Sequence, residues 1–356
     1  MSEFPTHPGA VTAGWLTERL REAGELDAGR VTSVSWQPIG TGQVGDSARF
    51  SLEYAGGDGP PTLAGKFPAA DATSRGTAAA FGLYAKEVGF YRELASRLEV
   101  RLPKTYAAEV DESGTDFVLL FEDLGPCRQG NQLDSCSLDD ARHAIRQAAA
   151  IHAPSWNNAD VIDREWLHMR PEALARVKAL YPQAQAIFAE RYGDTLEPQL
   201  MEVCAQLNEA SEHWFGREGG HRCLIHGDFR LDNMLFDIRG GAEPVAVLDW
   251  QTVAVGNGLT DIGYFLGCGI GDALRREAER DLLDLYCTQM TARGVPMTRE
   301  AVWDDYRLGA LHGVSTAVFS AAFVERTERG DANFLSMARG ACALAREHGS
   351  IELLRS

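Results

Sequence analysis

Cysteine is sparse in this 356-residue chain, and its pattern excludes two common kinds of site. The seven cysteines are scattered, odd in number and form no C-x-x-C pair. A disulfide framework needs paired cysteines, and a structural zinc site usually contains C-x-x-C. The pattern therefore favours a reducing compartment.

Long apolar runs and positive charge are also lacking. No run approaches the roughly 20 residues that span a bilayer, and the start "MSEFPTHPGAVTAGW" lacks the basic patch and apolar core of a secretory signal. We therefore expect a cytoplasmic protein that does not contact membranes. The 34 basic residues are outnumbered by 51 acidic ones, for a net charge of −17. This balance argues against a general affinity for nucleic acid, so any phosphate ligand must be held by local groups.

Several enzyme signatures are absent too. The chain has no Walker A loop, no H-E-x-x-H and no G-x-S-x-G, and it contains neither an internal repeat nor a low-complexity tract. The sequence therefore gives no support for the enzyme classes that depend on these signatures.

What the chain does contain is a change of pattern along its length, which suits two lobes. Residues 1–30 are predicted to form an N-terminal helical extension, and residues 31–125 a small β-rich lobe. Residues 126–356 are predicted to form a larger helical lobe, which opens with an N-cap arrangement of Ser137 and Asp140. The expected strands of the first lobe are 31–39, 47–54, 62–67 and 116–125, with a helix at 77–98. The further helices are expected near 171–191, 195–216, 272–293, 299–326 and 331–349.

The stretch "LIHGDFRLDNMLFD", residues 224–237, places polar side chains at fixed offsets between apolar ends. The apolar runs 234–236 and 246–248 flank the turn-rich "DIRGGAEPV", which predicts a β-hairpin. Strands of equal length that return antiparallel would place Asn233 and Asp249 opposite one another at the open end of that hairpin. An amide oxygen beside a carboxylate suits Mg²⁺, so these two residues are the candidate metal ligands.

Asp228 lies five residues before Asn233, on the loop that enters the hairpin. A carboxylate there can accept a hydroxyl proton while a metal neutralises phosphate charge. His226 and Gly227 support this catalytic loop, the first by packing and hydrogen bonding and the second by allowing a sharp turn. The alternative is that Asp228 and Asn233 only cap turns. Asp232 and Asp237 are interpreted as ordinary solvent or turn residues.

Gly40, Gly42 and Gly45 form a G-x-G-x-x-G pattern, which is weak evidence by itself. A dinucleotide fingerprint must open a helix, whereas the residues after Gly45 alternate as a strand. Strand, glycine loop and strand is the arrangement that covers ATP phosphates in kinases. The alternative is a glycine-rich hairpin without a ligand.

Lys66 lies in the next predicted strand, and Glu87 lies on the apolar face of the following helix. An unpaired buried glutamate would cost several kcal/mol, of order 3 to 5, so a lysine from the adjacent strand is its expected partner. The pair would hold Lys66 against the phosphates. The alternative is that both side chains reach solvent.

With these motifs in this order, the chain resembles the aminoglycoside phosphotransferase superfamily of kinase-like enzymes, from about residue 31 to 270. "HGDFRLDN" departs from protein kinases, which have arginine between the histidine and the aspartate, and "VLDWQTVAVGNGLTDIGYFLG" resembles the ecdysteroid kinase-like branch and related bacterial phosphotransferases. The resemblance implies an α+β, bilobal protein-kinase-like fold and dependence on ATP and Mg²⁺.

The resemblance also implies roles residue by residue. Asp228 would be the catalytic base, Asn233 and Asp249 the Mg²⁺ ligands, and Lys66 the phosphate contact paired with Glu87. Asp261 would brace the catalytic loop, or else cap the following helix. The resemblance assigns no role to Arg230, which either meets the γ-phosphate or simply pairs with Asp232. The hinge that offers backbone groups to adenine would consist of Phe121, Glu122, Asp123 and Leu124.

The expected function is therefore transfer of the γ-phosphate of ATP to a hydroxyl of a small molecule, by a monomer or homodimer. Aromatic residues in 154–220 either wall an apolar acceptor pocket or, as the weightier alternative, pack the helices. They are Trp156, Trp166, Tyr181, Phe188, Tyr192, Trp214 and Phe215. The branch resemblance favours an apolar, steroid-like or hydroxyacyl alcohol over an aminoglycoside. The competing function is a pseudokinase module that binds a nucleotide without turnover and acts through a partner.

Overall fold

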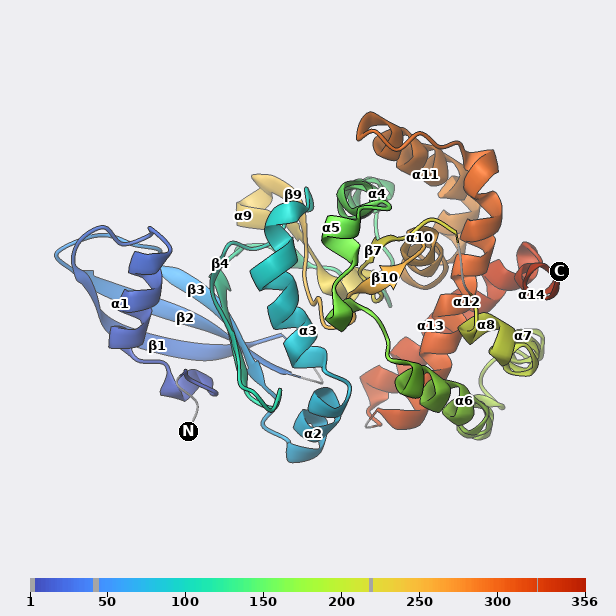
Figure 1. The fold of residues 1–356 in the computed structure, drawn as a ribbon, viewed down its shortest axis with the longest axis horizontal. Coiled ribbons are helices and arrows are strands. Elements are labelled where there is room, and N and C mark those ends of the chain that lie inside the picture. Colours follow the sequence, from blue (N-terminus) through green and yellow to red (C-terminus); the bar gives the residue numbers. More distant parts are fainter. Residues whose placement is uncertain (1–3, 41–44, 218–219, 325) are drawn as a thin grey trace. The chain divides into compact units, whose positions relative to one another are not determined.

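The computed structural model describes residues 4–40, 45–217, 220–324 and 326–356 (Figure 1). The chain divides into two units by its internal contacts. The first unit contains Met1–Arg97, Arg101–Pro126 and Leu248–Thr252. The second contains Leu98–Val100, Cys127–Val247 and Val253–Ser356. The short segment Leu248–Thr252 thus belongs to the first unit although both of its neighbours in sequence belong to the second.

An antiparallel five-stranded sheet with the order β1-β2-β3-β5-β4 forms the centre of the first unit. The helix α1 (Ala13–Glu22) packs on it and contributes Leu16 and Leu20 to a core with Phe50 and Phe67. The strands predicted in this region are confirmed, but β4 was not predicted. The strands are β1 (Arg30–Ile39), β2 (Gly45–Ala55), β3 (Thr62–Pro68), β4 (Thr105–Val110) and β5 (Phe117–Glu122).

The single helix expected at 77–98 is wrong, because the chain breaks there. Asp71 caps α2 (Ala72–Ala80), and Gly82 then adopts a left-handed φ of +66° before α3 (Leu83–Gly89) begins. A π-helical turn (Phe90–Leu94) and a 3-10 turn (Ala95–Arg97) follow. Glycine adopts this backbone conformation at little cost, so the break is local and α3 keeps its apolar face toward the sheet.

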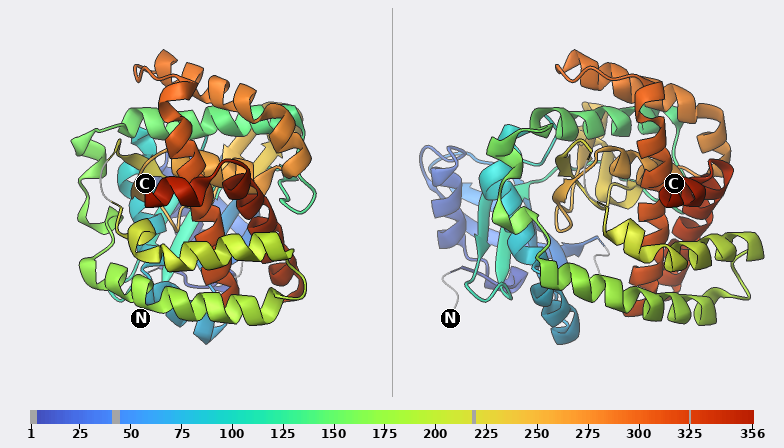
Figure 2. Two further views of the ribbon diagram at one scale, coloured as in Figure 1. Left: turned by 90° about the vertical axis from the view of Figure 1, so that its right-hand side faces the viewer. Right: turned by 45° about the vertical axis from the view of Figure 1, so that its right-hand side comes forward.

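Helices dominate the second unit, and the predicted capping box at the start of α4 (Leu138–Ser155) is confirmed. The predicted helix at 195–216 is instead two helices, α7 and α8, which Ala210 separates. Helices α6 and α7 lie against α12 and α13 (Figure 2). The other helices are α5 (Ala159–Ile162), α6 (Pro171–Tyr192), α7 (Pro198–Glu209), α8 (Ser211–Phe215), α9 (Ile238–Gly241), α10 (Leu259–Tyr264), α11 (Asp272–Ala292), α12 (Arg299–Phe323), α13 (Glu328–Glu347) and α14 (Ser350–Arg355).

Two small sheets frame the polar stretch 224–237. The predicted hairpin is confirmed, since β8 (Met234–Asp237) pairs antiparallel with β9 (Glu243–Val247). Its register is one residue away from the predicted one, because Met234 lies opposite Val247, and this pairing does not set Asn233 opposite Asp249. The strand β6 (Arg128–Gln129) extends this sheet. In the other sheet, β7 (Cys223–Ile225) pairs with β10 (Ala254–Gly256), which was not predicted. The loop between β7 and β8 is therefore anchored by a strand at each end.

Helices α10 and α12 cross at unusually close range. A Cβ atom at Gly309 would lie 2.2 Å from the carbonyl oxygen of Leu259, and one at Gly263 would lie 2.5 Å from the carbonyl carbon of Gly309. Only glycine permits this approach, because real Cβ atoms do not come within 3.0 Å of such neighbours. The crossing brings α12 against α10, the helix that contains Asp261.

The helices in the described part of the chain include none that is both long and apolar enough to span a membrane. All seven cysteines are free thiols, and the closest contact between them is Cys204 to Cys342, with 3.5 Å between the Sγ atoms.

We predict that Gly309→Ala destabilises the protein by about 1 to 3 kcal/mol, because the new methyl group must displace backbone at the α10–α12 crossing. The matched control is Gly76→Ala, in the interior of α2, where a Cβ atom meets nothing within 4 Å. That substitution should be neutral or stabilise by up to about 1 kcal/mol through helix propensity. Urea unfolding of both variants measures the difference, and equal stability would contradict a tight crossing.

Candidate active site

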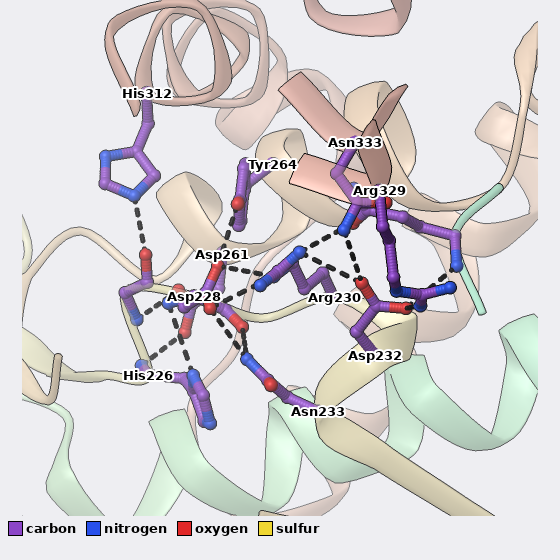
Figure 3. A network of polar contacts seen from close by, with 12 residues as sticks. His226, Asp228, Arg230, Asp232, Asn233, Asp261, Tyr264, His312, Arg329 and Asn333 are labelled. Atoms are coloured by element: carbon purple, nitrogen blue, oxygen red, sulfur yellow. Dashed lines mark hydrogen bonds and ion pairs between the residues drawn. The ribbon is translucent and has the colours of Figure 1, made fainter. Parts of the chain in front are cut away.

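The carboxylate of Asp228 is held by three neighbours of the second unit (Figure 3). The Tyr264 hydroxyl donates to Oδ1 over 2.8 Å, and Asn233 Nδ2 donates to Oδ2 over 2.8 Å. Arg230 Nε lies 2.9 Å from Oδ1 and 3.0 Å from Oδ2. The Asp228 side chain keeps 24% of its surface exposed. It is therefore an oriented carboxylate that still reaches solvent.

The surroundings of Asp228 favour its ionised form. Burial by itself raises the pKa of this carboxyl, but the charge of Arg230 and the hydrogen bond from Tyr264 outweigh burial, and the net pKa is lowered. Asp228 is thus ionised at neutral pH, and its hydrogen-bond donors set its direction.

Asp261 is fully buried in the first turn of α10, and it forms hydrogen bonds with the backbone of the loop that contains Asp228. Its carboxylate accepts hydrogen bonds from the backbone amides of His226 (2.6 Å) and Gly227 (3.0 Å). His152 Nε2 lies 3.2 Å from the same carboxylate. Burial raises the pKa of Asp261, but His152 and the loop amide more than offset this and the pKa is lowered. The N-cap of α10 is Gly258, so the geometry favours the bracing role over helix capping.

His226 supports the loop from inside. It is fully buried, and its Nδ1 accepts a hydrogen bond from the backbone amide of Asp228 over 3.2 Å. An amide can only donate, so Nδ1 carries no proton. Gly227, between them, has a φ of +80°, the sharp turn expected from its sequence position.

Arg230 pairs with both neighbouring aspartates rather than with one. Besides Asp228, its Nη1 contacts Asp232 Oδ2 (3.1 Å) and Gln132 Oε1 (3.3 Å). Burial lowers the pKa of Arg230, but the two carboxylates and Tyr264 raise it by more. The net pKa is therefore raised, and the guanidinium stays charged. The interpretation of Asp232 as an ordinary solvent residue is wrong. Its side chain is only 12% exposed and also accepts a hydrogen bond from the backbone amide of Gln132.

The first unit contains a second polar cluster, around Lys66. Its Nζ lies 2.7 Å from Glu87 Oε2 and 3.1 Å from Asp249 Oδ1. The expected pairing of Lys66 with Glu87 is therefore present, and Glu87 is 1% exposed rather than turned to solvent. The Trp250 amide also donates to Glu87, over 3.3 Å, and the Trp250 ring stacks on Phe90 with centroids 3.8 Å apart.

One amine faces two carboxylates in this cluster. Burial lowers the pKa of Lys66, but Asp249 and Glu87 outweigh it and raise the pKa. The pKa of Glu87 is raised, first by burial and also by the Asp249 charge. The cluster thus carries a surplus negative charge. Asp249 has a left-handed φ of +63°, which is uncommon for a residue other than glycine and concentrates at functional sites.

The remaining expected nucleotide-binding residues lie in the first unit. Gly40 ends β1 with a φ of +73°, whereas Gly42 lies outside the described residues. A Cβ atom at Gly45 would come within 3.0 Å of the Phe67 carbonyl oxygen and 3.5 Å of Lys66 Cε, so glycine leaves room beside the lysine. The two strands flanking the loop pair antiparallel, as expected for a strand, glycine loop and strand.

The four expected hinge residues lie at the end of β5 and directly after it. Phe121 and Glu122 end that strand, and Asp123 and Leu124 come next. The Glu122 carboxylate contacts Arg101 over 2.7 Å, and Asp123 contacts Arg49 over 2.7 Å. Both acidic side chains are therefore engaged within the protein, and the backbone of Phe121 and Glu122 pairs with the neighbouring strand β3.

The aromatic residues expected in the acceptor region divide into two groups. Tyr181, Phe188 and Tyr192 are fully or almost fully buried and pack the helices, which was the weightier alternative. The others keep part of their surface exposed; they are Trp156, Trp166, Trp214 and Phe215.

Two residues that contact the catalytic loop were not foreseen from the sequence. Tyr264 lies three residues after Asp261 on the same helix, a spacing that places both on one face and is a signal that could have found it. His312 lies on α12, and its Nε2 contacts the Gly227 carbonyl oxygen over 2.8 Å. No local pattern points to His312, since it is 85 positions from the residue that it contacts.

The model of the ecdysteroid kinase-like family matches residues 47–294. A putative aminoglycoside phosphotransferase from Ralstonia eutropha aligns with a TM-score of 0.54 and 17% identity, over 93% of this chain and 98% of that chain. Choline kinase from Cryptosporidium parvum aligns with a TM-score of 0.55 and 12% identity, over 89% of each chain. These likenesses confirm the expected α+β, protein-kinase-like fold.

Curated relatives share shorter stretches. The probable acyl-CoA dehydrogenase IBR3 of Arabidopsis thaliana is 27% identical over 186 residues, which are 50% of this chain and 22% of that protein. Human acyl-CoA dehydrogenase family member 11 is 48% identical over 42 residues, 12% of this chain and 5% of that protein. The chain therefore spans at most about a fifth of the length of these relatives.

We predict that Lys66→Met destabilises the protein by about 3 to 5 kcal/mol, because Glu87 and Asp249 then face each other without a cation. The deficit should shrink below neutral pH, as the raised pKa of Glu87 lets it take up a proton. The matched control is Lys104→Met, which removes a half-exposed lysine paired with Glu25 and should cost at most about 1 kcal/mol. Urea unfolding at two pH values measures both, and a pH-independent deficit in Lys66→Met would argue against the charged cluster.

Proposed function

The chain belongs to the ecdysteroid kinase-like family, and on that premise we propose that it transfers the γ-phosphate of ATP to a hydroxyl group of a small molecule, with Mg²⁺ as cofactor. The observation that carries the proposal is the state of Asp228, an ionised and partly exposed carboxylate whose direction three neighbours set.

Asp228 suits the role of the base that receives the acceptor's proton. A carboxylate offers about four lone-pair positions, and the donors on Asp228 leave room for an acceptor hydroxyl. Its lowered pKa makes it a weak base, but phosphoryl transfer passes through a loose transition state in which positioning contributes more than proton abstraction. We assign His226 the task of holding the Asp228 amide, and thereby the loop.

Asn233 and Asp249 fit the donor set of a Mg²⁺ site. The side-chain nitrogen of Asn233 donates to Asp228 twice, to its carbonyl oxygen (2.8 Å) and to its carboxylate (2.8 Å). The amide oxygen of Asn233 is therefore the atom left to bind a cation, and Asp249 adds a carboxylate. Bound Mg²⁺ would neutralise phosphate charge. Within the described ranges no group of three histidine, cysteine or acidic side chains forms a closed metal site, which matches a cation that takes few protein ligands.

In this proposal the first unit binds the nucleotide. Lys66, fixed by Glu87, would contact the phosphates, and the glycine segment with Gly40, Gly42 and Gly45 would cover them. The backbone of the hinge from Phe121 to Leu124 would bind the adenine. The salt bridges of Glu122 with Arg101 and of Asp123 with Arg49 support this proposal, because they keep the two carboxylates away from the base.

For the acceptor we propose an apolar, steroid-like or hydroxyacyl alcohol rather than an aminoglycoside. The support is the ecdysteroid kinase-like family and the stretches shared with proteins named as acyl-CoA dehydrogenases. The free thiols support a cytoplasmic location, where cysteines stay reduced.

We predict that Asp228→Asn lowers kcat by about 10² to 10⁴-fold, because the amide has the same shape but cannot accept the proton. The measurement is ATP consumption with a panel of sterols, hydroxyacyl compounds and aminoglycosides, with the phosphorylated product detected by mass spectrometry. The matched control is Asp237→Asn, in the same stretch, whose side chain is 59% exposed and pairs with Arg128. It should retain the wild-type kcat.

Two results would count against the proposal. Equal turnover by wild type and Asp228→Asn would exclude Asp228 as the base. Thermal stabilisation by ATP and Mg²⁺ without any phosphorylated product would instead favour a nucleotide-binding module without turnover.

A further inference from the structure

Two side chains of the helical unit that lie outside the stretch 224–237 contact the catalytic loop. Tyr264, at the end of α10, reaches the side chain of Asp228, and His312, in the middle of α12, reaches the backbone just before it (Figure 3). Both contacts come from regular helices rather than from loops. They can therefore hold the loop more rigidly than its own residues can.

The Tyr264 contact restrains the carboxylate itself. Tyr264 is fully buried, and its hydroxyl donates to Asp228 Oδ1 over 2.8 Å while Asn233 occupies Oδ2. A carboxylate with a donor on each oxygen cannot rotate about its bond to Cβ without losing one of them. A buried tyrosine hydroxyl normally finds some partner, but here the partner is the one carboxylate to which we assign the chemistry.

The His312 contact restrains the loop backbone. Its Nε2 lies 2.8 Å from the Gly227 carbonyl oxygen, which can only accept, so Nε2 carries the proton. The opposite side of the same residue is held by Asp261, which accepts from the Gly227 amide over 3.0 Å. Both the backbone amide and the carbonyl oxygen of Gly227 are thus hydrogen-bonded to side chains. This matters because a glycine at a φ of +80° has no side chain of its own to fix it.

The two side chains also hold each other, and the glycine crossing sets their spacing. The rings of Tyr264 and His312 meet edge to face, with centroids 5.2 Å apart and an interplanar angle of 81°. A Cβ atom at Gly313 would lie 3.2 Å from Tyr264 Cδ2 and 2.6 Å from Cys268 Sγ. Together with Gly263 and Gly309, this glycine lets α12 approach α10 closely enough for both side chains to reach one loop.

We propose that Tyr264 and His312 are positioning residues that orient the Asp228 carboxylate and its loop for phosphoryl transfer. This inference rests on the proposed function. It goes beyond it because it assigns the alignment of the base to two helices outside the stretch 224–237. Neither residue needs to touch a substrate to act in this way.

The first test compares Tyr264→Phe with Tyr306→Phe. Tyr306 is equally buried, and its hydroxyl donates to the Glu279 carboxylate over 3.1 Å, away from the catalytic loop. Each substitution removes one buried hydroxyl from one carboxylate, so the loss of stability should be similar. Tyr264→Phe should lower kcat by about 10- to 100-fold with the KM for ATP changed by at most about twofold. Tyr306→Phe should leave both close to wild type.

The second test uses two variants of His312. His312→Gln keeps an N–H donor at a similar reach, whereas His312→Leu keeps the bulk and removes the donor. We expect His312→Leu to lower kcat by about tenfold and His312→Gln to recover most of that loss, because only the hydrogen bond to Gly227 differs. Equal kcat in the two variants would overturn the role of His312, and a kcat of Tyr264→Phe equal to that of Tyr306→Phe would overturn the role of Tyr264.

A readout without substrates separates this inference from the proposed function. Amide hydrogen exchange of the peptide covering residues 224–234 should be faster in Tyr264→Phe and His312→Leu than in Tyr306→Phe, measured on the ligand-free full chain. If the wild type phosphorylates no acceptor in the panel, the proposed function fails, and the exchange rates alone decide whether the two residues hold the loop. Unchanged exchange in both variants would overturn the inference even if the enzyme is active.

Discussion

The buried carboxylate of Asp261 is the constraint on which the catalytic loop depends. The loop begins where β7 ends, so the amides of His226 and Gly227 have no strand to pair with, and Asp261 accepts both. An ionised carboxylate with no exposed surface is costly unless each oxygen is hydrogen-bonded. The two loop amides and His152 meet that need. The charge and the loop therefore stabilise each other, and the loop geometry that directs Asp228 follows from a helix that comes after it in sequence.

Charge is distributed differently in the two units, although the chain as a whole is acidic. In the first unit Lys66 faces two carboxylates, those of Glu87 and Asp249. In the second unit Arg230 lies between Asp228 and Asp232, and Arg329 lies 3.6 Å from Asp232. The first cluster therefore has more carboxylates than cations, whereas in the second the two are equal in number.

The part of the site that could be predicted is the part that depends on local pattern. The Lys66 and Glu87 pair followed from a glutamate on an apolar helix face, and the hairpin after Asn233 followed from two apolar runs and a turn. The break at Gly82, the strand β4 and the separate helices α7 and α8 were missed, because tertiary packing overrides weak local preferences. His312 was missed for a different reason. Its contact exists only because two helices far apart in sequence meet at glycines, and no pattern near His312 reports that crossing.

The local and the distant contacts have different physical origins. Asp228, Asn233 and Lys66 lie in patterns that the sequence itself reports, whereas the contacts of Tyr264 with Asp228 and of His312 with Gly227 come from α10 and α12. Helix α12 continues beyond His312 to Ser315 and Phe319, which pack on Trp214 and Phe215 of α8. A substitution along that face of α12 would therefore affect both the packing of α8 and the hydrogen bond to Gly227. The geometry of the loop thus depends on residues that are far from it in sequence.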